Sequence, residues 1–233
     1  FDKAEADHLY NICNGNILTI TSVQNEQKSI SPPRLYDLTT LQREANRYYG
    51  YTAQQTLDFT QNLYEKKLVT YPRTDSQFLT EDMEATALEM IAMVKMQFGF
   101  GSSVYPWHPD VKRVVNNSKV TDHHAIIPTA EISKGKLNEL SQGEKDILIL
   151  IAQRLLSATA PRHIYLETKI IADCAGSEFT AKGKTIKENG WKSVEAAFRR
   201  TLKSKEQREK ALSPISVMLS PTKIAVISFL KAS

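Results

Sequence analysis

The chain changes its hydrophobic periodicity twice, and no other feature of the sequence constrains its fold as strongly. Ile17 to Val23 (ILTITSV) and residues 163–174 (HIYLETKIIADC) are rich in β-branched residues or alternate as strands do. Between them, apolar residues recur at helical spacing, as in residues 38–48. Pro32-Pro33 and Pro161 stand where the pattern changes, and proline commonly marks such boundaries. A helical block therefore lies between two strand-rich segments.

This order predicts an α+β, multidomain fold. Residues 32–161 are expected to form a mainly helical lobe. Residues 1–31 and 162–233 are expected to form one β-rich domain into which that lobe is inserted, because the two flanking segments have the same character.

Composition narrows the class of protein. The chain has 233 residues, 41% of them hydrophobic and 24% charged, which excludes disordered, collagen-like and coiled-coil chains. No apolar run approaches the roughly 18 residues of a membrane span, so no membrane partner is expected. Two cysteines are too few for a disulfide framework or a cysteine-based zinc site, which favours a reducing compartment. The net charge of +4 is a weak indication of an anionic partner.

Two consecutive helices are predicted at the start of the helical block. The first begins at Leu38, with Thr39 and Gln42 as a capping box, and ends at Gly50. The second runs from Thr52 to Lys66, with Thr52 and Gln55 as its capping box, so the pair resembles a helix-turn-helix.

Further elements follow along the chain. We expect a short strand at 68–71, a helix from Thr80 to Phe98, and a helix capped by Ser141 and Glu144 that is apolar nearly all round and hence buried. The last part predicts a strand, a turn and another strand, with turns around Gly183 and Gly190, and a charged loop or short helix at 203–210.

Residues 68–76 (LVTYPRTDS) carry the sharpest chemical signal. Pro72 keeps the residue before it extended, so Tyr71 and Arg73 should lie on one face of the chain. A phenol and a guanidinium side by side suit attack on a phosphodiester, since the phenol can act as nucleophile while the guanidinium neutralises phosphate charge. An arbitrary Tyr-x-Arg more often means a packed tyrosine and a solvated arginine.

Residues 121–129 (TDHHAIIPT) carry the second signal. Neighbouring side chains on an extended segment point to opposite faces, so His123 and His124 are not expected to bind one metal. One of them could donate a hydrogen bond to a phosphate oxygen. By itself the pair more often means ordinary surface or core histidines.

Taken together, these motifs resemble those of type IA DNA topoisomerases of the topoisomerase III type. The resemblance covers residues 10–195 and rests on PPRLYDLTTLQREANRYYGYTAQQTLDFTQNLYEKKLVTYPRTDSQFLT, the later DHHAIIPT, and YLETKIIADCAGSEFTAKGKTIKENGW. It implies that Tyr71 is the nucleophile that forms a 5′-phosphotyrosyl bond, that Arg73 contacts the scissile phosphate, and that His123 holds a phosphate oxygen. The other residues of the two motifs are implied to contact DNA: Thr74, Asp75, Ser76 and His124.

The resemblance also implies partners outside this sequence. The family's Toprim domain binds Mg²⁺ through an Asp-x-Asp, which does not occur here, and its fourth domain completes the DNA groove. The chain is therefore expected to be the gate domain and the tyrosine-bearing lobe of a longer, cytoplasmic, nucleoid-associated bacterial enzyme, and to be inactive alone.

The expected function is transient cleavage of single-stranded DNA and passage of a strand, without ATP. Three alternatives are a non-catalytic helix-turn-helix DNA-binding module, a tyrosine recombinase and a purely structural domain. The recombinase is disfavoured because its arginine and His-x-x-Arg precede the nucleophile, whereas here the motif histidine follows Tyr71 and no His-x-x-Arg occurs. If one phosphate is the common ligand, the functional ends of Tyr71, Arg73 and His123 should lie within about 10 Å of each other, with the tyrosine hydroxyl partly exposed.

Overall fold

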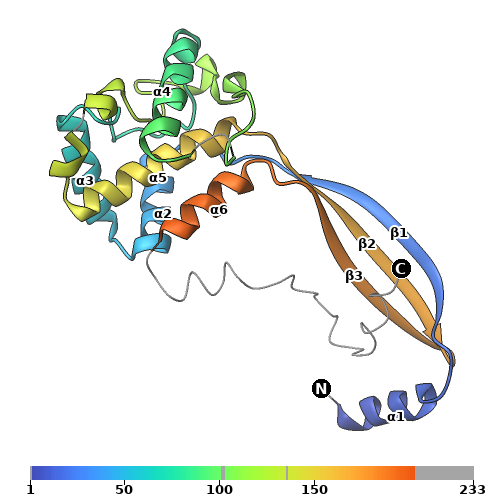
Figure 1. The fold of residues 1–233 in the computed structure, drawn as a ribbon. Helices are drawn as coiled ribbons and strands as arrows, with labels where there is room; N and C mark the ends of the chain where they lie inside the picture. Colours follow the sequence, from blue (N-terminus) through green and yellow to red (C-terminus); the bar gives the residue numbers. More distant parts are fainter. Residues whose placement is uncertain (1, 101–102, 135, 203–233) are drawn as a thin grey trace. The chain divides into compact units, whose positions relative to one another are not determined.

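A computed structural model describes residues 2–100, 103–134 and 136–202, which combine helices and a sheet in two compact units (Figure 1). The strand unit contains residues 2–29 and 164–188. The helical unit contains residues 30–163 and 189–202. The greater part of the helical unit thus lies, in sequence, between the two parts of the strand unit.

The strand unit consists of a helix and three long strands. These are α1 (Lys3–Cys13), β1 (Thr19–Ile30), β2 (His163–Cys174) and β3 (Ser177–Glu188). The strands follow the order β1-β2-β3, and β2 pairs antiparallel with β3. Ala175 and Gly176 form the two-residue turn between β2 and β3. Both have positive φ (51° and 79°), and a turn with these angles matches the twist of the strands on either side. The predicted strand at 163–174 is confirmed.

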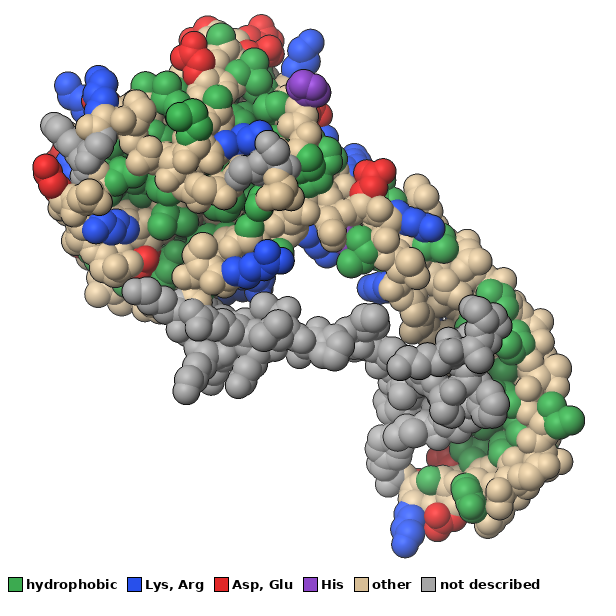
Figure 2. All heavy atoms as spheres, viewed as in Figure 1, with side chains coloured by type: hydrophobic (Ala, Val, Ile, Leu, Met, Phe, Trp, Pro, Cys, Tyr) green, Lys and Arg blue, Asp and Glu red, His purple; other side chains and the backbone are tan. Residues whose placement is uncertain are grey.

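Two predictions about this unit were wrong, and one helix was not predicted. β1 continues to Ile30, well past Val23, because its polar residues lie on exposed strand surface and bond across to β2, as in the 2.5 Å contact between Lys28 and Glu167. Gly183 lies within β3 and not in a turn. The helix α1 was not predicted, because it has no buried residue and hence no apolar stripe. Apolar side chains on the open surface of the strands are visible in Figure 2.

The helical unit is built around α5 (Gln142–Thr159), which packs against four other helices. These are α2 (Leu38–Tyr49), α3 (Ala53–Glu65), α4 (Glu84–Gln97) and α6 (Lys192–Thr201). Short 3₁₀ turns connect them: Glu81–Met83, Val111–Val114, Asn117–Lys119, Ala130–Lys134 and Lys136–Glu139. Most residues of α5 are buried, as its nearly uniform apolar character predicted.

Side-chain capping explains where α2, α3 and α5 begin. The Ser141–Glu144 and Thr52–Gln55 capping boxes are confirmed. Gly50 ends α2 with a φ of 74°, a left-handed conformation that glycine adopts without strain. The predicted Thr39–Gln42 box is wrong, because the side chain of Asp37 accepts the hydrogen bond from the amide of Thr40. The N-cap of α2 is therefore Asp37, two residues before the predicted Thr39.

The helix α6 corrects the prediction of a β-rich chain from residue 162 onward. Gly190, with a φ of 51°, packs so closely on the carbonyl of Arg162 that a Cβ would lie 2.2 Å from it, and the chain turns there into a helix. Val194 and Phe198, four residues apart, are then buried. Two apolar residues at helical spacing were too few to predict a helix directly after Gly190, which indicated a turn. The loop or short helix predicted at 203–210 lies outside the described residues.

A buried charge network joins α2, α5 and the segment before α2. The guanidinium of Arg154 pairs with Glu44, donates to the Tyr36 hydroxyl (3.0 Å) and to the carbonyl of Arg34 (3.1 Å), and lies over the Tyr36 ring. The Tyr36 hydroxyl donates to Glu44 at 2.5 Å. Burial raises the pKa of Tyr36 well above its usual value, so the phenol stays protonated and can donate.

We expect Glu44→Ala to lower the free energy of unfolding by about 3 kcal/mol, because it leaves the buried Arg154 charge without its counter-ion. Chemical denaturation followed by far-ultraviolet circular dichroism measures this. Glu131→Ala is the control, since it breaks an exposed ion pair with Lys134 and should cost less than about 1 kcal/mol. Equal losses in both variants would show that the network does not stabilise the fold.

Candidate active site around Tyr71

A tight turn after α3 directs the Tyr71 segment back along that helix. Lys67 has a φ of 60°, which is unusual for a residue other than glycine. Its amide donates to the carbonyl of Tyr64 (2.8 Å), and the amide of Leu68 donates to the carbonyl of Leu63 (2.8 Å). These bonds satisfy the last carbonyls of the helix and reverse the chain direction. Tyr71 is thereby returned to the vicinity of Tyr64.

The Tyr71 segment is held against the second motif by backbone hydrogen bonds. The amide of Thr70 donates to Ile127 (2.9 Å), and the amide of Thr129 donates to Leu68 (3.0 Å). The Thr70 hydroxyl joins the same segment, because it donates to one carbonyl and accepts from the amide of Ile127. The predicted strand at 68–71 is only an isolated bridge between Val69 and Pro128. Pro128 has no N–H to continue a ladder.

Burial alternates along the chain after Tyr71, which bends at Pro72. Pro72, Thr74 and Ser76 are buried, whereas Arg73 and Asp75 are exposed and Tyr71 is half-buried. Tyr71, Arg73 and Asp75 are therefore the accessible residues of this segment, and its even-numbered neighbours are enclosed. That the phenol and the guanidinium share one face stays a prediction.

The two inner hydroxyls make their hydrogen bonds within the protein. Thr74 donates to the carbonyl of His123 (2.9 Å) and accepts from the amide of Ser76 (3.1 Å). The hydroxyl of Ser76 contacts the carbonyl of Lys119 at 2.8 Å. Thr74 and Ser76 are only 8% and 4% exposed, which argues against the direct DNA contacts expected from the sequence. Their hydroxyls instead fix the backbone on which the outer side chains are mounted.

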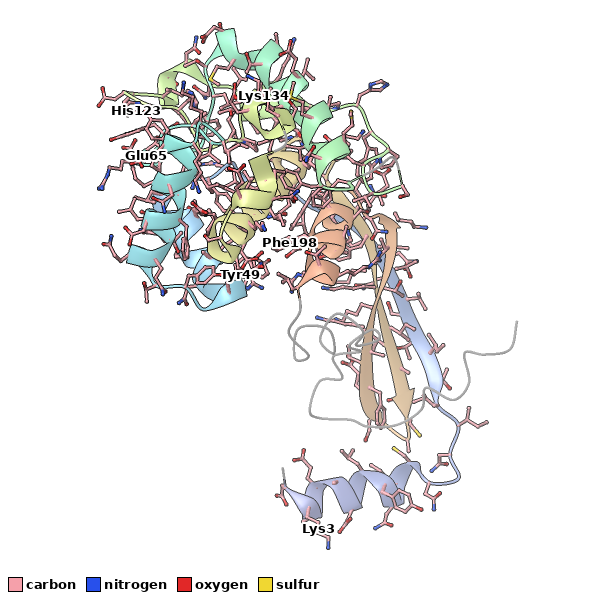
Figure 3. The ribbon with its side chains drawn as sticks, turned by 60° about the vertical axis from the view of Figure 1, so that its left-hand side comes forward. Lys3, Tyr49, Glu65, His123, Lys134 and Phe198 are labelled. Atoms are coloured by element: carbon pink, nitrogen blue, oxygen red, sulfur yellow. The ribbon has the colours of Figure 1, made fainter. Side chains whose placement is uncertain are left out.

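His123 lies against Tyr71 although 52 positions separate them. Their ring centroids are 4.3 Å apart, with the planes tilted by 44°. His123 is exposed, and Figure 3 shows it at the same edge of the helical unit as Glu65, the last residue of α3. Two of the three predicted catalytic side chains are thus neighbours at the surface.

His124 is half-buried and makes a different set of contacts from His123. Its Nδ1 lies 2.9 Å from the carbonyl of Ala125. His124 also lines an open hollow of about 520 Å³ together with Tyr71. The other residues around the hollow come from the end of α3 and the two paired segments: Tyr64, Glu65, Lys67, Val69, Thr70 and Thr129. The hollow gives a ligand access to one side of Tyr71.

Tyr64 is an aromatic neighbour of Tyr71 that the motifs did not indicate. Its ring meets that of Tyr71 edge-to-face with centroids 5.3 Å apart, and it is 39% exposed. Helical spacing placed Tyr64 near the end of α3. No sequence signal indicated the left-handed turn at Lys67 that brings Tyr71 back to it.

Two cationic side chains lie near the Tyr71 segment, and both are placed over the ring of Phe78. The guanidinium of Arg34 and the ammonium of Lys119 each lie over its ring, 5.2 and 5.1 Å from the centroid. Both side chains are exposed. Arg34, Lys119 and Arg73 are thus exposed cationic side chains that could bind an anionic ligand near Tyr71.

The described ranges contain no group of three His, Cys, Asp or Glu side chains able to hold a metal ion. The residues present around Tyr71 therefore do not fit a magnesium site, and we assign no step to the metal here. Within the same ranges, no helix combines the length and apolar character needed to cross a bilayer.

Comparison with known proteins gives a consistent result. A family model described as DNA topoisomerase matches residues 1–222. DNA topoisomerase 3 of Bacillus licheniformis is 40% identical over 206 residues, and that of Bacillus subtilis is 39% identical; each alignment covers 83% of this chain. The chain spans 27% of the length of each of these relatives.

A solved structure of full-length topoisomerase I from Thermotoga maritima is also similar. Its TM-score is 0.59 and its sequence identity 25%, over 83% of this chain and 32% of that one. The family model, the relatives and this structure all indicate the same family. The chain belongs to the DNA topoisomerase family.

Proposed function

We propose that this chain is the tyrosine-bearing part of a type IA topoisomerase that cleaves and reseals single-stranded DNA. The single observation that supports this most is the contact between Tyr71 and His123, because neither a helix-turn-helix module nor a structural domain requires these side chains to meet at the surface. In this proposal the helical unit is the tyrosine-bearing lobe and the strand unit belongs to the gate domain. Toprim and fourth domains of the same polypeptide would complete the groove and bind Mg²⁺.

The reaction we propose exchanges one phosphodiester for another. The Tyr71 oxygen attacks phosphorus and forms a phosphotyrosyl bond to the 5′ end, while the bond from phosphorus to the 3′ oxygen breaks. The phenolic proton passes to water, and the 3′ oxygen leaves as a hydroxyl after taking up a proton. Attack by that hydroxyl reverses the step, so no ATP is consumed.

The neighbours of Tyr71 have separate tasks in this scheme. Arg73, two residues after Tyr71 and exposed, binds the non-bridging oxygens as negative charge builds up on them. His123, in contact with the Tyr71 ring, donates a hydrogen bond to one of these oxygens. Arg34 and Lys119 neutralise neighbouring phosphates, and Asp75 and His124 lie where DNA bases or sugars pass. Such an enzyme would act in the cytoplasm, where bacterial DNA is found.

In an intact enzyme containing this chain, Tyr71→Phe should abolish the covalent protein–DNA adduct. Only the nucleophilic oxygen is lost, so affinity for single-stranded DNA should change by less than about tenfold. Trapping end-labelled DNA under denaturing conditions detects the adduct, and fluorescence anisotropy measures the affinity. An adduct formed by the Phe variant would show that another residue is the nucleophile.

Arg73→Ala should slow cleavage and resealing by about 100-fold, because one preorganised donor to the developing charge is removed. Single-turnover rates with a cleavable oligonucleotide measure the effect. Arg73→Lys is the matched variant: it keeps the charge but loses bidentate geometry, so its rate should fall between those of the Ala variant and the native enzyme. Unchanged rates in both variants would exclude a role in the transition state.

Thr74→Val tests whether this residue positions the site or contacts DNA. Val keeps the shape of Thr but leaves the His123 carbonyl and the Ser76 amide without a partner, which should cost about 1–3 kcal/mol of stability and slow cleavage. Thr74→Ser retains the hydroxyl and should restore both. Weakened DNA binding with unchanged stability would instead favour a direct DNA contact.

A further inference from the structure

The two cysteines of the chain, 161 positions apart, lie next to each other in the strand unit. The Cys13 thiol is 3.6 Å from the carbonyl of Cys174, and the Cys174 thiol is 3.8 Å from the carbonyl of Cys13. Neither cysteine is part of a disulfide in the structure. Reciprocal contacts of this kind mean that the two residues face each other.

Local structure fixes both partners. Cys174 is the last residue of β2 and pairs with Ser177 across the tight Ala175-Gly176 turn. Cys13 is the last residue of α1, where the amide of Asn14 donates to Tyr10 (2.8 Å) and the side chain of Asn16 donates to Ile12 (2.8 Å). The two thiols are therefore held near each other by a hairpin and a capped helix end.

The two thiols differ in access to solvent. Cys13 is partly exposed, whereas Cys174 is only 4% exposed. Burial, together with a hydrogen bond to the Cys13 side chain, raises the pKa of the Cys174 thiol. An oxidant from solution therefore meets Cys13 first, and Cys174 is placed to react with the product.

We propose that Cys13 and Cys174 form a reversible disulfide when the chain meets a disulfide oxidant such as oxidised glutathione. The Cys13 thiolate attacks one sulfur of the oxidant, giving a mixed disulfide and one glutathione thiolate. The Cys174 thiolate then attacks the Cys13 sulfur and releases the second glutathione. Two protein thiols are oxidised, one glutathione disulfide is reduced to two thiols, and the two protein protons end on glutathione.

The bond would link the end of α1 to the hairpin end of β2 and β3. In the reduced chain the two cysteines meet through non-covalent thiol contacts, whereas the disulfide would join α1 to the hairpin covalently. The site therefore couples the attachment of α1 to the redox state. This inference concerns the strand unit alone and does not depend on the topoisomerase reaction.

The experiment uses the purified 233-residue chain in glutathione buffers of graded ratio, quenched with an alkylating reagent and analysed by intact mass and non-reducing peptide mapping. We expect the monomer to lose about 2 Da and both alkylation sites, with one peptide pair containing Cys13 and Cys174. The effective concentration of the two thiols should be at least about 100-fold higher in the folded chain than in urea.

Single substitutions distinguish the proposal from ordinary thiol chemistry. Cys174→Ser should accumulate one glutathione on Cys13, because the resolving thiol is gone, whereas the native chain should not accumulate this adduct. Cys13→Ser should react slowly, since only the buried thiol remains. Stable glutathione adducts on the native chain, disulfide-linked dimers, unreacted thiols, or equal effective concentrations in folded and unfolded chains would each overturn the proposal.

Discussion

The buried guanidinium of Arg154 is the interaction on which the helical unit and its site depend. From α5 it reaches Glu44 on α2 and the hydroxyl of Tyr36. The carbonyl of Tyr36 in turn accepts from the amide of Ile126, in the segment that carries His123 and pairs with the Tyr71 segment. The buried charge is thus linked, through two hydrogen-bonded steps, to the segment that carries His123. Breaking the pair is costly because an unpaired charge would remain in the low-dielectric interior.

The site separates structural from chemical residues by the alternation of burial along the Tyr71 segment. The inner side chains, Thr74 and Ser76, make hydrogen bonds to other backbone segments. The outer ones, Tyr71 and Arg73, remain available to a ligand. The inner hydroxyls thus tie an irregular segment to its neighbours by hydrogen bonds from side chains to backbone.

The strand unit shows a different relation between sequence and structure. Its strands expose side chains on most of their surface, so their patterns alternate weakly and the polar half of β1 was not recognised. Its cysteines were interpreted from their number alone, as too few for a framework. Only the fold shows that Cys13 and Cys174 are adjacent, because nothing in sequence spacing encodes a contact across 161 positions.

The sequence by itself determined the features that arise from neighbours along the chain. These include the helices capped by Thr52 and Ser141, the burial of α5, and the strand at 163–174. Each depends on capping or periodicity, and these act over a few residues.

Only the tertiary structure decided the features that depend on packing between distant segments. The ring of Tyr64 meets Tyr71 because Lys67 adopts a left-handed conformation that its residue type does not favour. Tyr71 meets His123 because residues 125–129 pair with residues 68–70. Thr74 and Ser76 were expected to contact DNA, but they are buried, with hydrogen bonds to the carbonyls of His123 and Lys119. The motifs named the candidate residues, and packing between distant segments decided which of them are accessible.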